Sequence, residues 1–189
     1  MKLILGSQSK QRQKVLRDMG YEFEVVKPET DEKAIRCEDP KELTLKIAHA
    51  KMDDVIKKVA EEALVITGDS VTIVDGEIRE KPKDKNQAYE WISQISDGVP
   101  QTQVSSVVIA NTKTGQRYDG VEEASVIFNR IPEPDAREFV ESGTAFNHAG
   151  AYAIQNPIFE RCIKSVHGEF EAIAGLPKKL TADLLAKFE

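Results

Sequence analysis

The chain of 189 residues contains little cysteine and histidine, and this scarcity excludes two kinds of site. Its two cysteines, Cys37 and Cys162, form no Cys-x-x-Cys or Cys/His spacing, so the sequence indicates neither a zinc site nor a disulfide framework. The three histidines, His49, His148 and His167, show no spacing typical of metal ligands. We therefore expect reduced, structural thiols and assign no chemistry to the histidines.

Long apolar runs and an excess of positive charge are also missing. No apolar segment approaches the roughly 20 residues that a bilayer span needs, and the apolar start over Leu3–Gly6 is too short for a secretory signal. The formal net charge of -6 disfavours bulk binding to DNA or RNA, because such binding needs a basic surface. We expect a cytoplasmic protein that spans no membrane and forms no stable complex with nucleic acid.

The composition that is present, 40% hydrophobic and 31% charged, is that of an ordinary globular protein. A chain of this length buries roughly 70% of its unfolded surface when it folds. No repeat, low-complexity tract or Ser/Gly linker divides the sequence, so we predict a single domain over residues 1–189.

Hydrophobic periodicity predicts alternating strands and helices. The expected strands are Leu3–Leu5, Tyr21–Val26, a strand that ends at Asp69, Val71–Val74, Glu77–Arg79, Val104–Ala110 and Val121–Phe128. The expected helices are one between Ser9 and Gly20, a long one with an apolar stripe from Leu43 to Val59, Asn86–Ile95, Asp135–Val140 and Leu180–Phe188. Asp75-Gly76 predicts a hairpin turn. The pattern favours an α/β fold with a mixed sheet, in an elongated, two-lobed single domain with a central cleft.

The segment from Ala63 to Ser70 carries the most functional information. A buried-type strand leads directly into Thr67-Gly68-Asp69-Ser70. In open α/β sheets, ligands bind where strands end, so Asp69 is a candidate catalytic carboxylate. The alternative is a carboxylate that only satisfies its own turn.

The turn that follows the first strand offers a phosphate-binding pattern. Ser7 and Ser9 precede a helix that carries Lys10, Arg12 and Lys14 near its start. Free backbone N–H groups and the positive end of the helix dipole attract anions there. The alternative is that Ser9 is an ordinary N-cap and the basic residues face water.

Three further charged positions have a structural and a functional interpretation each. Lys51 lies within the apolar stripe of the long helix, so it either extends to the surface or points into a cleft where an anion compensates its charge. Lys81, which precedes Pro82, is either solvated or a second cation that the proline aims. Asp31 and Glu32 either lie in a merely soluble acidic loop or help to hold a hard divalent cation.

Taken together, these residues resemble the Maf-type nucleoside triphosphate pyrophosphatases, also called septum formation proteins Maf, over essentially the whole chain. The family's S-x-S-P-R-R opening is similar to the segment from Ser7 to Arg12, and its D-E pair is similar to Asp31-Glu32. The other motifs that resemble the family's are Ala48–Met52, Thr67–Ser70, Glu80–Pro82, Ala149–Gln155 and Gly175–Pro177.

The resemblance implies hydrolysis of a nucleoside triphosphate to the monophosphate and pyrophosphate, in control of the nucleotide pool. It implies assistance by Mg²⁺ or Mn²⁺, a Maf/ITPase-like fold with the site in a cleft between two lobes, and a possible homodimer. Asp69 would be the general base or a metal-linked activator of water, and Glu32 and Asp69 would help to hold the metal. The implied substrate contacts are Ser7, Gln11, Arg12, Lys51, Ser70, Lys81 and Gln155.

The sequence also departs from the family pattern. Lys10-Gln11 stands in place of Pro-Arg, Thr102–Ser106 in place of H-x-V-x-T, and Asn156 in place of glycine. The altered Lys10-Gln11 and Thr102 positions motivate an alternative, a catalytically weakened, nucleotide-binding regulatory protein linked to cell division. Ser70 and Gln155 agree with the branch that prefers dTTP and UTP over 7-methyl-GTP, so we predict a pyrimidine preference.

Overall fold

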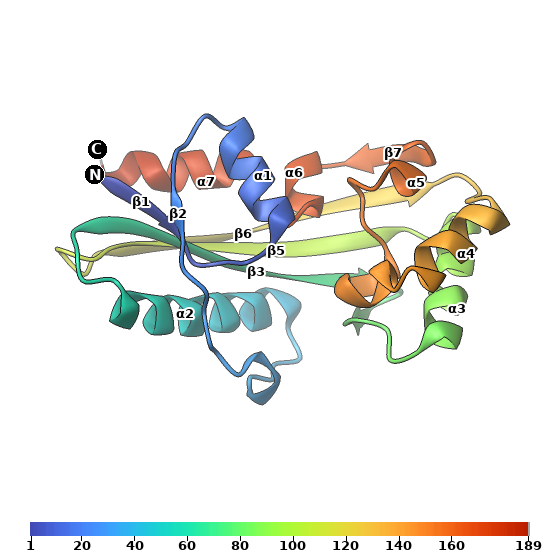
Figure 1. Cartoon of the computed structure of the whole chain (residues 1–189), viewed down its shortest axis with the longest axis horizontal. Helices are drawn as coiled ribbons and strands as arrows, with labels where there is room; N and C mark the ends of the chain where they lie inside the picture. Colours follow the sequence, from blue (N-terminus) through green and yellow to red (C-terminus); the bar gives the residue numbers. More distant parts are fainter. Residues whose placement is uncertain (189) are drawn as a thin grey trace. The chain divides into compact units, whose positions relative to one another are not determined.

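The computed structural model describes residues 1–188, which form an α/β structure around a mixed seven-stranded sheet (Figure 1). The sheet order is β2-β1-β3-β5-β6-β7, and β4 pairs with β3. β1 is parallel to β2 and β3, whereas β4 is antiparallel to β3 and β7 to β6. The strands are β1 (Lys2–Leu5), β2 (Glu24–Val25), β3 (Ala63–Val74), β4 (Glu77–Arg79), β5 (Gln101–Asn111), β6 (Arg117–Phe128) and β7 (Ile163–His167). The predicted α/β class with a mixed sheet is confirmed.

The predicted helices are present, with boundaries that shift by a few residues. Ser9 caps the first helix, because its hydroxyl accepts from the Arg12 N–H, and Asp39 caps the long helix ahead of Pro40. The α-helices are α1 (Lys10–Asp18), α2 (Pro40–Lys58), α3 (Lys85–Ser96), α4 (Glu133–Glu141), α5 (Pro157–Glu160), α6 (Phe170–Ile173) and α7 (Lys178–Leu185). Short 3₁₀ turns occur at Glu32–Ala34, Thr144–Asn147, Ala149–Ala151 and Ala186–Phe188. None of the helices within residues 1–188 has the length and apolar character that a membrane crossing requires.

The chain divides into two compact units. The first unit comprises Met1–Ser70, Val104–Glu122 and Gly175–Glu189, and the second comprises Val71–Gln103 and Glu123–Ala174. The prediction of a single domain stays a prediction.

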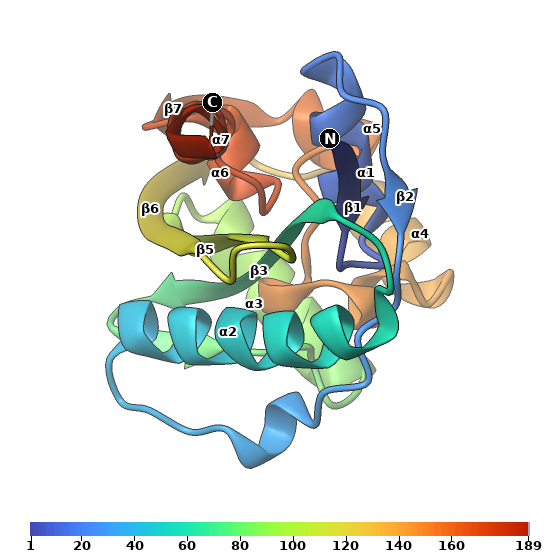
Figure 2. The ribbon, with the colours of Figure 1, turned by 90° about the vertical axis from the view of Figure 1, so that its left-hand side faces the viewer.

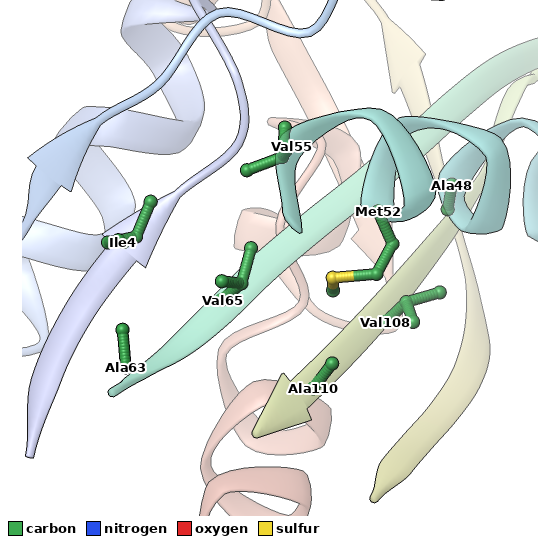
Figure 3. Packing of buried hydrophobic residues seen from close by; sticks show 8 residues of the cluster. All are labelled: Ile4, Ala48, Met52, Val55, Ala63, Val65, Val108 and Ala110. Carbon is green, nitrogen blue, oxygen red and sulfur yellow. The ribbon is translucent and has the colours of Figure 1, made fainter. Parts of the chain in front are cut away.

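In the first unit, α2 covers one face of the sheet, and α1 and α7 lie on the other face (Figure 2). Ala48, Met52 and Val55 of α2 pack against buried side chains of β1, β3 and β5, as Figure 3 shows. The buried strand residues of this cluster are Ile4, Ala63, Val65, Val108 and Ala110. This core holds α2 against the strand that carries Asp69.

The predicted end of a strand at Asp69 is wrong. β3 continues through Asp69 to Val74, and the chain reverses only at Asp75 and Gly76, whose φ angles of 50° and 82° suit a tight hairpin turn. The strand continues because Val71–Val74 is rich in β-branched side chains and can pair with β4. Asp69 is therefore a mid-strand residue and not a loop residue. The strand predicted at Tyr21–Val26 shortens to Glu24–Val25.

In the second unit, four aromatic side chains form a cluster within the buried core. Phe159 contacts Phe128, Phe139 and Tyr152, with ring centroids 4.8 to 6.1 Å apart. This core lies next to the segment that begins at Gly150, whose backbone N–H donates to the Glu80 carbonyl at 3.1 Å. The family-like segment Ala149–Gln155 is thus tied to the loop that carries Lys81.

Candidate functional site

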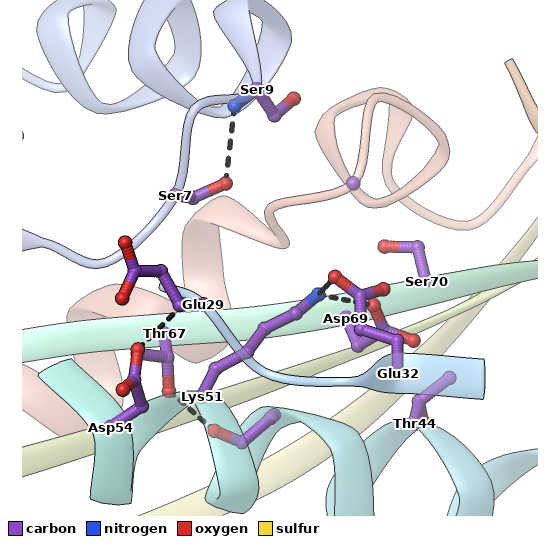
Figure 4. Close-up of polar contacts among 12 residues, drawn as sticks. Ser7, Ser9, Glu29, Glu32, Thr44, Lys51, Asp54, Thr67, Asp69 and Ser70 are labelled. Carbon is purple, nitrogen blue, oxygen red and sulfur yellow. Dashed lines mark hydrogen bonds and ion pairs between the residues drawn. The ribbon is translucent and has the colours of Figure 1, made fainter. Parts of the chain in front are cut away.

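Lys51 of α2 is a buried cation between two carboxylates (Figure 4). Its Nζ lies 2.7 Å from Oδ1 of Asp69 and 3.1 Å from Oε1 of Glu32. Lys51 is 5% exposed and Asp69 7%, whereas the Glu32 side chain is 51% exposed. The lysine therefore does not extend to the surface. The compensating anions of the other interpretation are present, in the form of the Asp69 and Glu32 carboxylates, while a cleft at this point stays a prediction.

Burial and the neighbouring positive charges shift the pKa of Asp69 in opposite directions. Burial raises the pKa of the Asp69 carboxyl, while the positive charges of Lys51 and Arg12 lower it and Glu32 raises it. Burial has the largest effect, so the pKa of Asp69 lies above its ordinary value. A carboxylate with a raised pKa is a better acceptor of a proton near neutral pH.

Arg12 of α1 makes three hydrogen bonds that fix its guanidinium. Its Nε donates to the Gly175 carbonyl at 2.8 Å, Nη2 to Ser70 Oγ at 3.0 Å and Nη1 to Ser7 Oγ at 3.3 Å. Burial lowers the pKa of Arg12, although Asp69 and Glu32 oppose this shift, and a guanidinium stays charged at any physiological pH. The site thus holds a permanent cation in one orientation. Ser9 is the N-cap, as the structural interpretation predicts, but Arg12 is held by hydrogen bonds and does not simply face water.

Gly68 permits a close approach between β3 and β5. A Cβ at this position would lie 2.5 Å from the Ser106 carbonyl oxygen, so only glycine fits without movement of the backbone. The next residue, Asp69, donates its backbone N–H to Ser106 Oγ at 3.3 Å. Gly68 therefore determines where β3 places the Asp69 carboxylate.

Neighbouring residues of β3 point to opposite faces of the sheet, as in any strand. Asp69 faces α2 and meets Lys51, whereas Ser70 meets Arg12 and accepts a hydrogen bond from Ser105 Oγ at 2.9 Å. Lys51 compensates the charge of Asp69 on one face of the sheet. Arg12 orients the Ser70 hydroxyl on the other face. The arrangement combines a buried proton acceptor with charge that can neutralise phosphate oxygens.

The remaining predicted residues lie apart from these contacts or in the second unit. Gln11 is half-buried in the first turn of α1. Lys81 is exposed. Burial lowers the pKa of His148, and the positive charge of Lys81 lowers it further. Gln155 is half-buried in a turn, and the neighbouring Asn156 caps α5 by accepting from the Ile158 N–H at 2.9 Å. This cap gives Asn156, where the family has glycine, a structural role.

Three residues help to hold the site together in roles that the sequence motifs did not predict, namely Ser105, Ser106 and Gly175. Ser105 and Ser106 lie in a strand of apolar character, and both are fully buried. Buried hydroxyls need hydrogen-bond partners, so their presence in such a strand was an available signal. The Gly175 carbonyl gave no signal, because its partner Arg12 is 163 residues away in the sequence.

The carboxylates of the site fit one mode of divalent-metal binding. Among residues 1–188, no group of three or more His, Cys, Asp or Glu side chains is placed to hold a metal ion. Glu32 and Asp69 nonetheless contact one ammonium, so two carboxylates converge on a single point. Mg²⁺ commonly uses one or two protein carboxylates together with substrate phosphates and water. Glu32 and Asp69 therefore suit a metal site whose other ligands are substrate phosphates and water. They do not suit a site in which every ligand comes from the protein.

Comparison with known families gives a match over nearly the entire chain. Residues 2–188 fit the family model described as Maf-like protein. The chain belongs to this Maf-like family. The resemblance seen in the sequence motifs is thereby confirmed.

Curated relatives of this Maf-like chain align end to end with it. A protein of Dictyostelium discoideum named 7-methyl-GTP pyrophosphatase is 36% identical, with 98% of this chain and 96% of the relative covered. A protein of Vibrio cholerae named dTTP/UTP pyrophosphatase is 32% identical, with 99% and 98% covered. A Thermoanaerobacter protein of the same name is 27% identical, with 99% and 96% covered.

Proposed function

We propose that this Maf-like protein hydrolyses nucleoside triphosphates to the monophosphate and pyrophosphate. The observation that carries the proposal is the buried contact between Lys51 and Asp69, with Arg12 close enough to influence the pKa of the same carboxyl. The family and the names of its relatives support the same reaction. Phosphoryl transfer depends mainly on positioning and neutralisation of charge, which these side chains are suited to supply.

The chemical step follows from the properties of Asp69. Its carboxylate accepts a proton from water as the water oxygen bonds to the α-phosphorus. The bond between this phosphorus and the oxygen that bridges to the β-phosphorus breaks, and pyrophosphate leaves with the electron pair. Lys51 and Arg12 neutralise oxygens of the triphosphate, and Ser7 donates to one of them. The raised pKa of Asp69 favours the proton transfer.

Glu32 and Asp69 would hold Mg²⁺ or Mn²⁺ together with phosphate oxygens in this proposal. When bound, such an ion would neutralise the charge that develops on the phosphate oxygens. Lys51 contacts the same two carboxylates, at 2.7 Å from Asp69 and 3.1 Å from Glu32. Glu32 is half-exposed and can turn towards a ligand at little cost.

Base preference, location and assembly belong to the same proposal. Gln155 and Ser70 contact the nucleotide, Gln11 contributes to base choice, and Lys81 supplies a third cation. A glutamine presents both a donor and an acceptor to a base edge, so it suits a pyrimidine such as uracil or thymine. We expect a cytoplasmic enzyme that forms a homodimer.

The alternative, a regulatory protein that binds nucleotides without turnover, is not favoured. Each of the compared relatives carries the name of a pyrophosphatase. The changes that motivated it coexist with a hydrogen bond from Arg12 to Ser70 and an ion pair between Lys51 and Asp69. Asn156, a further departure, acts as a helix cap.

A panel of nucleotides tests the proposal. The protein is incubated with Mg²⁺ or Mn²⁺ and each of UTP, dTTP, 5-methyl-UTP, 7-methyl-GTP, ATP and GTP, and pyrophosphate is measured. Asp69→Asn keeps the shape of the side chain and removes its basicity, so pyrophosphate release should fall to background. Asp53→Asn, which removes a surface carboxylate paired with Arg117, is the matched control and should retain activity. Absence of pyrophosphate for every nucleotide contradicts the proposal.

A further inference from the structure

Two buried hydroxyls that the proposed chemistry does not use connect the sheet to α2. Thr67 Oγ1 of β3 donates to the Ala48 carbonyl at 2.8 Å, and Ser106 Oγ of β5 donates to the Thr44 carbonyl at 2.8 Å. Both hydroxyl-bearing residues are fully buried. Carbonyls inside a helix already accept from the N–H four residues later, so these bonds are not needed for the helix itself.

The two acceptors share a face of α2 with Lys51. Positions 44, 48 and 51 are four and three residues apart, the spacing of neighbours along one side of a helix. On β3, Thr67 precedes Asp69 by two residues and therefore points to the same face of the sheet. Ser106 Oγ also accepts from the backbone N–H of Asp69, at 3.3 Å. Both hydroxyls thus lie between the backbone that carries the lysine and the backbone that carries the aspartate.

We infer that Thr67 and Ser106 are positioning residues that set the distance between Lys51 and Asp69 by fixing α2 against the sheet. The inference rests on the proposed function, because it assigns a purpose to that distance. The apolar contacts of Met52 and Val55 with the sheet are non-directional and allow small sliding or rotation of the helix. Hydrogen bonds to two successive turns of α2 remove that freedom.

Loss of the hydroxyls should change the electrostatics of Asp69. The charged groups that influence its carboxyl are Lys51 from α2, Arg12 from α1 and Glu32 from the 3₁₀ turn at Glu32–Ala34. Of these, only Lys51 is carried by the helix that the hydroxyls hold. Loss of the hydroxyls should therefore lengthen the contact of 2.7 Å between Lys51 Nζ and Asp69 Oδ1. A role confined to folding stability would leave this distance unchanged.

The test compares hydroxyl deletion with hydroxyl retention. Thr67→Val and Ser106→Ala remove the hydroxyls, whereas Ser106→Thr keeps one. Thr44→Val is the matched control, because that buried hydroxyl donates to Lys41 within α2 itself and does not reach the sheet. We expect the two deletions to lower kcat by about 10- to 100-fold with little change in KM, as misplacement of reacting groups does. Ser106→Thr and Thr44→Val should stay near the wild type in kcat and KM.

Two results would overturn the inference. One is that both deletions lower the midpoint of thermal unfolding but leave kcat unchanged. The other is that Ser106→Thr loses as much kcat as Ser106→Ala. Crystal structures of the two deletion variants give a readout that needs no turnover, the distance between Lys51 Nζ and Asp69 Oδ1. A distance that stays at 2.7 Å in both variants contradicts the inference, whereas a wild-type protein that releases no pyrophosphate contradicts only the proposed function.

Discussion

Replacement of Gly68 with alanine is a sharp test of how β3 presents Asp69. The new methyl group would lie 2.5 Å from the Ser106 carbonyl oxygen, closer than Cβ atoms approach in real structures. The backbone fixes the position of the new Cβ, and the Ser106 oxygen is itself a backbone atom, so neither atom can rotate away. β3 must therefore separate locally from β5. Asp69, the next residue, should move with the strand and lose its backbone hydrogen bond to Ser106 Oγ.

The size of the effect follows from overpacking. A group forced into a well-packed site costs about 1–3 kcal/mol of folding free energy. At roughly 2–4 °C per kcal/mol for a chain of this length, the unfolding midpoint should fall by about 2–12 °C. Catalysis should suffer more than stability, because a displacement of about 1 Å at the reacting group can cost roughly 100-fold in rate.

Calorimetry and pyrophosphate release at 25 °C, where the variant remains folded, measure the two effects. Gly120→Ala is the matched control: its methyl group would meet the Leu180 side chain, 2.7 Å from Cδ1, and a leucine can rotate away. It should keep nearly full activity. If Gly68→Ala retained activity within about threefold of the wild type, the backbone contact would not position Asp69 as argued.

Three other predictions concern the charges of the site. Arg12→Lys should lower kcat/KM by at least about 10-fold, because an ammonium cannot reproduce the three-acceptor geometry of the guanidinium; steady-state kinetics with equal rates for both proteins would refute this. The acidic limb of the kcat/KM profile should lie above pH 3.8, the ordinary pKa of an aspartate, because burial raises the pKa of Asp69 and the base must be ionised to act. In Lys51→Met, which removes a cation that lowers this pKa, the limb should move further up, and a shift to lower pH would contradict the assignment. Chelation with EDTA should abolish pyrophosphate release and added Mg²⁺ or Mn²⁺ restore it, with Glu32→Gln requiring more metal; full activity after chelation would exclude the proposed metal.

The sequence predicted features that depend on local pattern. The apolar stripe of the long helix predicted its position. The presence of Lys51 in that stripe left two interpretations open, and the structure supports the one with a compensating anion, since Asp69 and Glu32 contact the ammonium. Asp75-Gly76 predicted the hairpin, because both positions tolerate positive φ. These predictions required no knowledge of distant partners.

Features that depend on strand register and distant contacts could not be predicted. Asp69 was expected at the end of a strand, but β3 continues because β4 pairs with it from Thr72 to Val74. The orientation of Arg12 depends on the Gly175 carbonyl, and no local pattern indicates which backbone group a guanidinium meets. The hydroxyls of Thr67 and Ser106 donate to carbonyls of α2. Both residues lie in buried strands, and the sequence did not indicate which helix packs against those strands.

The central claim is that Asp69 activates water for attack at the α-phosphorus of a nucleoside triphosphate. Hydrolysis in water enriched in ¹⁸O, followed by mass spectrometry of both products, tests this most directly. The account predicts label in the nucleoside monophosphate and none in the pyrophosphate, with no product above background from Asp69→Asn. Label in the pyrophosphate, release of a nucleoside diphosphate and phosphate, or equal rates for the wild type and Asp69→Asn would contradict it.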